Sequence, residues 1–311
     1  MIFAARGLLV SLAFFATVYC PLSLLVVLAW PGMKRIGRES LLSSANLLFG
    51  LRIFPFAVSA VVTLLFTFPS FWLLERASPD EDAATFALAA CSLLILSAGL
   101  FRVLRAQART TRAVAQWLMG TPSLSSDAGT PTLSASSGAP PLILVGFRKP
   151  RVMVSDMAAI VLSEDELQAA VRHELGHARS WDNLKKALAS STPFPGMSSL
   201  QSAWQEAAEL AADDAAVANR REALNLAAAL IKLSRSSQQL PKLVLATGLV
   251  SGSSSISVRV ERLLGWRTAA RRVQRGWPWT LLVLLTMIVG IAGNYGATLV
   301  LTHRLTELLV P

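Results

Sequence analysis

Four long apolar runs dominate the pattern of hydrophobic and polar positions along the chain. They occupy residues 8–30, 56–74, 83–101 and 279–301. Each run approaches or exceeds the roughly 20 residues that an α-helix needs to cross a bilayer. The first run is too long for the apolar part of a cleavable signal peptide, and no small-residue cleavage site follows it. We therefore expect a frame of four transmembrane helices, the second flanked or kinked by Pro55 and Pro69.

Between the third and fourth runs the pattern becomes that of one soluble domain, residues 102–278. After a basic helical stretch comes a segment rich in Ser, Thr, Gly and Pro, residues 121–141. It cannot bury a core, so we expect it to be a flexible linker. Short apolar runs at residues 142–145 and 151–154, separated by a turn with Gly and Pro, predict a β-hairpin.

A helix with a clear start follows the predicted hairpin. Ser163 and Glu166 are three residues apart and form a capping box sequence. Apolar residues then recur at helical spacing, at Leu167, Ala170, Val171 and Leu175. Two further helices are predicted at residues 200–220, which are rich in Ala, and at residues 221–234. We expect a loop at residues 190–199 and a short helix before the last apolar run.

Composition and charge support a membrane protein and give it an orientation. The chain is 53% hydrophobic and only 15% charged, with a mean hydropathy of +0.51. Basic residues cluster in the first and third loops, whereas the second loop is mostly acidic. The positive-inside rule therefore places residues 102–278 in the cytoplasm and both termini outside. Most arginines flank the apolar runs, so we interpret the net charge of +10 as contact with anionic lipid rather than nucleic acid.

Candidate chemistry lies in the stretch "AVRHELGHARSWDN", residues 170–183, which holds two of the three histidines. His173 and His177 stand at i and i+4, so both project from one face of the capped helix and can bind one zinc ion. Glu174 can reach a water on that ion and act as general base. The same pattern also occurs on surface helices with solvated histidines. The helix cap and the acidic pattern that follows favour the metal site.

The next predicted helix offers a third ligand in "QEAAELAADDAAV". Glu209 would complete a His/His/Glu set, and Asp213, on the same helical face, could accept the spare N–H of a ligand histidine. Glu206 remains an alternative ligand. Asp182, five residues after His177, is either a helix-end residue or another partner of a ligand histidine. For the oxyanion, Tyr19, Tyr295 and His303 lie in or beyond the predicted spans, which leaves an arginine such as Arg220.

Taken together, "RKPRVMVSDMAAIVLSEDELQAAVRHELGHARSWDNL", "EAAELAADDAAV" and the four-span frame resemble the BlaR/MecR family of bacterial membrane zinc metallopeptidases. The resemblance covers the frame and most of residues 142–265. It implies a mostly α-helical protein of the cytoplasmic (inner) membrane. A zincin-like α+β domain of the gluzincin type would then be inserted between spans three and four. His173, His177 and Glu209 would be the zinc ligands and Glu174 the catalytic base, and Asp213 matches the second acid of the family's ExxxD.

One departure limits what this resemblance implies. The antibiotic-sensing members continue beyond the fourth span into an extracellular penicillin-binding domain, whereas this sequence reaches only Pro311. We therefore expect no such sensor domain, and neither direct β-lactam sensing nor cleavage of a DNA-binding repressor is implied. The motifs are also similar to those of the HtpX and CAAX-prenyl protease branch, which the four-span frame fits less well.

The sequence thus predicts a membrane-embedded enzyme with one zinc ion per chain. It would hydrolyse a protein or peptide at the cytoplasmic membrane face, with a cytoplasmic regulator as one candidate substrate and the bilayer as its other partner. The alternatives are a quality-control or processing peptidase of the HtpX/CAAX type and a non-catalytic signalling scaffold. Such peptidases bind substrate as an extended strand against a sheet edge, and we expect Val152, Met153 and Val154 to form that edge.

Overall fold

The computed structural model divides the chain into two units. The first contains residues 1–33, 51–98 and 270–311, and the second contains residues 34–50 and 99–269. The residues described are 2–36, 45–75, 83–118, 132–135, 139–146, 150–236, 246–247, 256–266 and 295–309. The protein is mostly helical, with one small sheet.

Three helical stretches are long and apolar enough to cross a membrane, namely Phe3–Lys34, Ala45–Leu74 and Ala83–Trp117. The first stretch belongs to α1 (Ile2–Ile36) and the third to α4 (Ala83–Leu118). The second is a continuous run of three elements: α2 (Ala45–Val62), the π-helix η1 (Thr63–Thr67) and α3 (Phe68–Leu74). They agree with the first three predicted spans. The fourth, residues 279–301, lies mostly outside the described residues, and α12 (Tyr295–Leu309) covers only its end.

In the first unit, large apolar side chains are exposed and small hydroxyl side chains are buried. Ser11 donates to the carbonyl of Gly7 at 2.6 Å, and Ser59 donates to that of Pro55 at 2.7 Å, so these hydroxyls are satisfied within their own helices. This distribution suits helices whose outer surface contacts lipid rather than water. The most exposed leucines of this unit include Leu25, Leu28, Leu64, Leu73 and Leu94.

Pro69 interrupts the backbone hydrogen bonds of the second predicted span, close to the π-helix η1. The carbonyl group affected by this interruption binds a residue of α12. Because proline has no N–H, it cannot donate to the carbonyl of Leu65, four residues earlier. The hydroxyl of Tyr295 on α12 donates to that carbonyl at 2.9 Å instead. The Tyr295 ring also lies 5.7 Å from the ring of Phe66. A neighbouring helix thus satisfies the backbone group that the proline leaves free.

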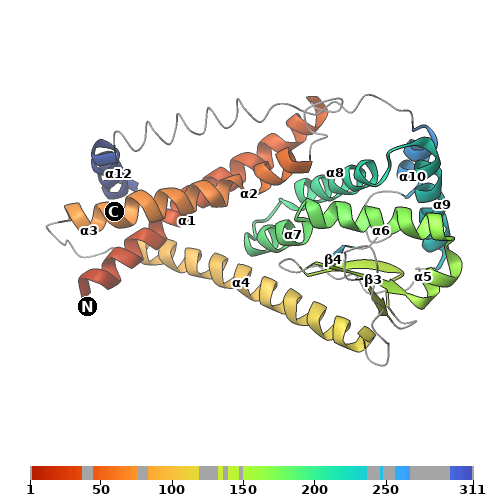
Figure 1. The fold of residues 1–311 in the computed structure, drawn as a ribbon. Coiled ribbons are helices and arrows are strands. Elements are labelled where there is room, and N and C mark those ends of the chain that lie inside the picture. The colour runs from red at the N-terminus through yellow and green to blue at the C-terminus, as the bar shows by residue number, and fades with distance from the viewer. Residues whose placement is uncertain are drawn as a thin grey trace. The chain divides into compact units, whose positions relative to one another are not determined.

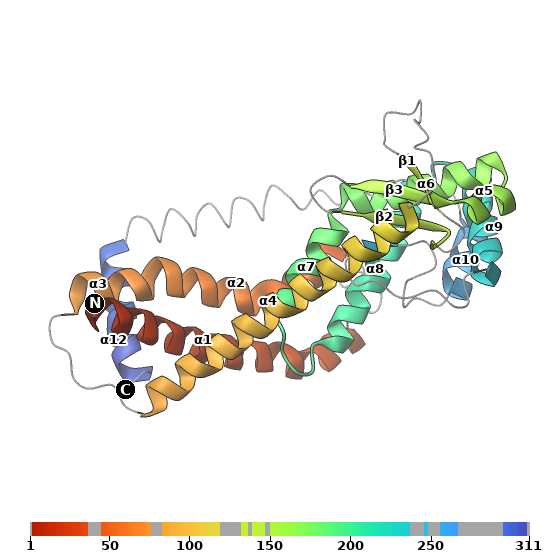
Figure 2. The same cartoon turned by 90° about the horizontal axis from the view of Figure 1, so that it is seen from below.

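The second unit is built around a four-stranded sheet of order β1-β3-β2-β4. Strands β2 (Leu142–Val145) and β3 (Arg151–Ser155) form the predicted antiparallel hairpin, with Ile143 opposite Met153. Strand β1 (Thr132–Ala135) is parallel to β3, and β4 (Ala246–Thr247) is antiparallel to β2. Strands β1, β3 and β2 lie side by side in Figure 2.

Both faces of the hairpin are covered, because its side chains alternate between two hydrophobic clusters. Leu142, Leu144 and Val152 pack with α6 (Glu164–Arg179) and α9 (Arg220–Ser236). On the opposite face, Ile143 and Met153 pack with Trp117, which lies near the end of α4. The remaining helices of the unit are α5 (Asp156–Val161), α7 (Asp182–Ser191), α8 (Ser198–Ala216) and α10 (Ile256–Leu264).

Two sequence expectations about this sheet are wrong. Val152, Met153 and Val154 do not form an edge, because β3 is paired with β1 on one side and with β2 on the other. The linker predicted at residues 121–141 does not extend over that whole range. Its residues 132–135 form β1, whose Thr132 lies opposite Val152, and Ala139 is buried. Part of the segment that we expected to be a flexible linker is therefore a strand, and this strand pairs with the side of β3 that β2 leaves open.

The start of α6 follows the prediction. Ser163 is the N-cap and accepts from the N–H of Glu166, while the Glu166 carboxylate accepts from the N–H of Ser163 at 2.8 Å, completing the capping box. Helix α7 was not predicted. It begins directly after Trp181, which adopts a left-handed backbone conformation with φ of 57° and separates it from α6.

Candidate metal centre

Close packing of α6 against α8 brings the candidate ligands together. A Cβ atom placed on Gly176 of α6 would lie only 3.3 Å from the Cα of Ala212 on α8. Glycine and alanine at this crossing therefore allow the two backbones to approach closely. In Figure 1, α8 runs along one side of α6 and the sheet lies on its other side. The ligand histidines of α6 face α8 as a result.

His173, His177 and Glu209 form a compact and buried group that could hold a metal ion. The Nε2 atoms of the two histidines are 3.2 Å apart. Each Nε2 atom also lies 3.6 Å from one carboxylate oxygen of Glu209. Three donor atoms from two helices thus surround one point.

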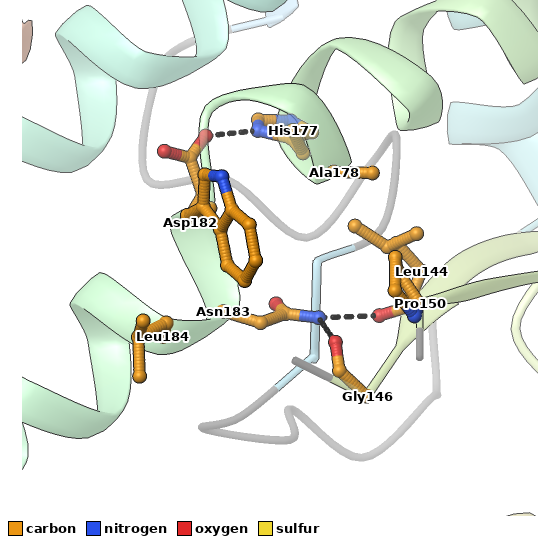
Figure 3. Close-up of a pocket in the computed structure, with 9 residues that line it drawn as sticks. Leu144, Gly146, Pro150, His177, Ala178, Asp182, Asn183 and Leu184 are labelled. Carbon is orange, nitrogen blue, oxygen red and sulfur yellow. Dashed lines mark hydrogen bonds and ion pairs between the residues drawn. The ribbon is translucent and has the colours of Figure 1, made fainter. Parts of the chain in front are cut away.

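Each histidine of the group has a carboxylate on its other ring nitrogen. Asp213 Oδ1 lies 2.9 Å from Nδ1 of His173. Asp182 Oδ2 lies 2.6 Å from Nδ1 of His177 (Figure 3). A carboxylate at Nδ1 favours the proton on that nitrogen, which leaves the Nε2 lone pair facing the centre. Asp182 is therefore both the first residue of α7 and a partner of a candidate ligand.

Arg259 of α10 completes the centre and was not expected from the sequence. Its guanidinium binds the Asp213 carboxylate with two hydrogen bonds of 2.8 and 2.6 Å, and its Nη1 lies 3.0 Å from Glu209 Oε2. The side chain is only 1% exposed. The sequence offers only a weak signal, the spacing of four residues that places Arg259 and the apolar Leu263 on one face of α10.

Negative charge predominates around the candidate ligands. Four acidic residues of the centre are buried, namely Glu174, Asp182, Glu209 and Asp213. The arginine that faces them, Arg259, is buried as well. Burying charges in such excess is unfavourable unless a cation compensates them. Protons on the two histidines or a bound metal ion can supply that positive charge.

The neighbouring charges also shift the pKa values of the candidate ligands His177 and Glu209. Burial alone would lower the pKa of His177, but Glu209 and Asp182 raise it to about 10. Burial alone would raise the pKa of Glu209, yet the two histidines and Arg259 hold it well below its usual value. Without a cation, the centre therefore keeps protons on nitrogen. Metal binding has to displace them.

Glu174 differs from the other acids of the centre. Its side chain is buried, and neither carboxylate oxygen has a hydrogen-bond partner among the described residues. Burial raises its pKa, and the positive charges of His173, His177 and Lys186 oppose that shift. Lys186 of α7 is half-buried, and burial lowers its pKa although Glu209, Asp182 and Glu174 act against it. A carboxylate of raised pKa beside a possible metal site is suited to accept a proton.

A small pocket lies beside His177, as Figure 3 shows. Its volume is about 120 Å³, and its walls include Trp181 and Leu144. Asn183 holds α7 against the end of β2, because its amide donates to the carbonyls of Leu144 at 3.1 Å and Gly146 at 3.0 Å. The hairpin and the start of α7 are thereby fixed next to a candidate ligand.

The remaining sequence candidates lie apart from the ligand group. Glu206, the alternative ligand, is exposed on α8 and does not belong to it. Arg220, considered for the oxyanion, is exposed at the start of α9. Tyr19, Tyr295 and His303 belong to the first unit. Arg259, by contrast, lies 3.0 Å from Glu209, and Lys186 interacts electrostatically with the same carboxylate.

Comparison with known proteins yields no relative, since no family model matches the chain and no curated protein shows significant similarity to it. Interpretation of the centre therefore rests on the residues and on their geometry.

Proposed function

We propose that this chain is a membrane-embedded zinc metalloendopeptidase of the gluzincin type, similar to the BlaR/MecR family. It would cut a protein or peptide at the cytoplasmic face of the membrane, with regulatory signalling as the setting. The single observation that carries this proposal is the position of Glu174. It is a buried carboxylate without a hydrogen-bond partner, next to a His/His/Glu group whose histidines each have a carboxylate behind them.

The donor set and its dimensions fit zinc. Zn²⁺ binds imidazole nitrogen and carboxylate oxygen at about 2.0–2.2 Å with tetrahedral geometry, which places neighbouring donor atoms about 3.3 Å apart. The two Nε2 atoms are 3.2 Å apart here, and each lies 3.6 Å from a different carboxylate oxygen of Glu209, Oε2 for His173 and Oε1 for His177. A shift of a few tenths of an ångström satisfies the geometry, and three protein ligands leave one position for a reactant, as in catalytic zinc sites.

The protein side chains then have distinct tasks. When bound, zinc would supply a Lewis acid that polarises the peptide carbonyl and makes water more acidic. Glu174 would take the proton of the attacking water and return it to the leaving amine, because its raised pKa brings it closer to the pH of the cell. Asp213 and Asp182 would keep the ligand histidines oriented, and Arg259 would hold Glu209 and Asp213 in place.

The membrane setting is part of the proposal. The three long apolar helices support membrane association. The apolar run at residues 279–301 supports a fourth span, and the charge pattern of the loops supports a cytoplasmic position for residues 102–278 with both termini outside.

A comparison of cells that produce the native chain with cells that produce Glu174→Ala tests the function. Peptides that appear in the membrane and cytosolic proteomes only with the native form identify the substrate. Purified Glu174→Ala should retain one zinc ion at the centre, because Glu174 is not a ligand. A variant that keeps both its zinc and its cleavage would refute the proposed role of Glu174. Identical proteomes from the two strains would favour the non-catalytic scaffold.

A further inference from the structure

We propose that Glu75, His303 and Glu307 form a second metal site, which binds a divalent transition-metal ion such as Zn²⁺ in the first unit. Their ligand atoms all lie within 4.8 Å of one another. These residues take no part in the proposed catalytic centre. The inference does not depend on the proposed peptidase activity.

The ligand atoms come from two helices whose register is fixed. Tyr295 of α12 is bonded to the carbonyl of Leu65, as described above. From Leu65 to Glu75 the chain advances about 15 Å along the helix, and from Tyr295 to His303 it advances about 12 Å, at about 1.5 Å per residue. A second contact joins the two elements, because His303 Nε2 lies 4.0 Å from Glu75 Oε2 where α12 crosses the end of the α2–α3 run (Figure 2). The packing of α12 thus delivers His303 to Glu75.

Glu307 supplies the third ligand from the same face of α12. It follows His303 by four residues, and its Oε1 lies 3.5 Å from His303 Nε2. A tetrahedral zinc site needs donor separations of about 3.3 Å. The 3.5 Å separation is near that value, and the longer one to Glu75 closes when a glutamate side chain adjusts. The Glu307 side chain, which is 62% exposed, can in turn adjust its own position to the other two ligands.

The predicted topology also brings these residues to one side of the membrane. The second and fourth predicted spans both run from the cytoplasm outward, so the residues that follow them should meet on one side. Glu75 ends α3, and His303 lies beyond the predicted fourth span. The ion would therefore come from the outer side of the membrane. It would join the end of the second span to the C-terminal helix.

The test counts zinc bound to the full-length chain in detergent. To separate this site from the catalytic centre, it uses a background in which His173→Ala and His177→Ala remove the first group. After equilibrium dialysis against Zn²⁺, this background should bind one equivalent, and the native chain should bind two. Adding His303→Ala to the background should abolish the remaining equivalent. Arg304→Ala is the matched control, because Arg304 is an exposed neighbour on α12, and it should leave that equivalent in place.

A second variant protects the test against misfolding. Glu307→Gln changes an exposed side chain, so the helix should remain folded while zinc affinity falls by at least about tenfold. The proposal is overturned if the background binds no zinc, or if its equivalent survives both His303→Ala and Glu307→Gln. Failure of the catalytic centre would give a different pattern, in which the native chain binds one equivalent that His303→Ala removes and His177→Ala does not.

Discussion

His173 and His177 on α6 have a counterpart in His303 and Glu307 on α12. Each pair stands one helical turn apart, and each faces a glutamate from another helix, Glu209 or Glu75. The surroundings of the two groups differ. The first group is buried, and Asp213, Asp182 and Arg259 hold its members. In the second, the side chains of Glu75 and His303 are 18% and 17% exposed, and that of Glu307 is largely solvated.

This difference separates two uses of the same ligand pattern. A group held by buried hydrogen bonds keeps its geometry and is suited to chemistry that needs a fixed reactant position. A solvated group reorganises when an ion binds, so it is suited to reversible binding. Among the residues that the structure describes, the first group has an acid in the position of a general base, Glu174, which is buried beside the ligands. The pattern alone therefore does not decide which of the two is catalytic.

The largest expected effect comes from removing that base. Glu174→Gln should lower the rate of peptide cleavage by about 10²–10⁴-fold, because the variant cannot accept the proton of the attacking water. Zinc content at the centre should not change. Cleavage of the substrate identified by proteomics measures the rate. Glu164→Gln, at an exposed position in the first turn of the same helix, is the control and should retain full activity.

Removal of Arg259 should leave the ligands of the buried group less firmly held, as they are in the group formed by Glu75, His303 and Glu307. Arg259→Ala leaves the Asp213 carboxylate buried without its main partner, which costs about 3–5 kcal/mol of stability. Zinc affinity should fall by about 10–100-fold, because Asp213 and Glu209 lose their support. Thermal unfolding and zinc competition measure the two effects.

Arg262→Ala is the matched control for that substitution. Arg262 lies on the same helix and pairs with Asp214, but both side chains are more than 40% exposed. An exposed pair contributes at most about 1 kcal/mol. Equal effects of the two substitutions would contradict the structural role assigned to Arg259.

Widening the helix crossing should weaken the buried group further. Gly176→Ala places a methyl group 3.3 Å from the Cα of Ala212, so α6 and α8 must separate slightly. We expect a loss of about 1–3 kcal/mol in stability together with weaker zinc binding. Gly50→Ala, where a Cβ would meet nothing within 4 Å, should be neutral or slightly stabilising. An unchanged melting temperature for Gly176→Ala would show that the crossing is not tight.

The last expected effect concerns the pH dependence of zinc binding at the buried group. In the metal-free protein the pKa of His177 is raised to about 10, so the imidazole is protonated at neutral pH. Zinc requires the neutral form, and each ion must therefore release a proton. Apparent affinity should rise with pH, about tenfold per unit for each proton displaced, and level off above the raised pKa. Calorimetry in two buffers of different ionisation enthalpy counts the protons, and zero release would refute this account.

The sequence predicts features that depend on residues close to one another along the chain, and it does not predict those that depend on distant partners. The capping box at Ser163, the i and i+4 histidines and the spacing of Glu209 and Asp213 follow from helical periodicity alone. The positions of β1 and Arg259 do not, because each depends on a partner far along the chain, Val152 for Thr132 and Asp213 for Arg259. No local rule states which strand pairs at an edge, so β3 was wrongly expected to be free.

Trp181 shows how much one backbone angle decides in the buried group. A bulky residue at φ of 57° is disfavoured by roughly 1–2 kcal/mol. The reversal at this residue ends α6 and starts a new axis with Asp182 as its first residue. The acid that faces His177 thus belongs to a separate rigid body from the imidazole, and the angle at Trp181 sets their alignment. A substitution at this joint that leaves all the ligands intact can still change which ring nitrogen carries the proton.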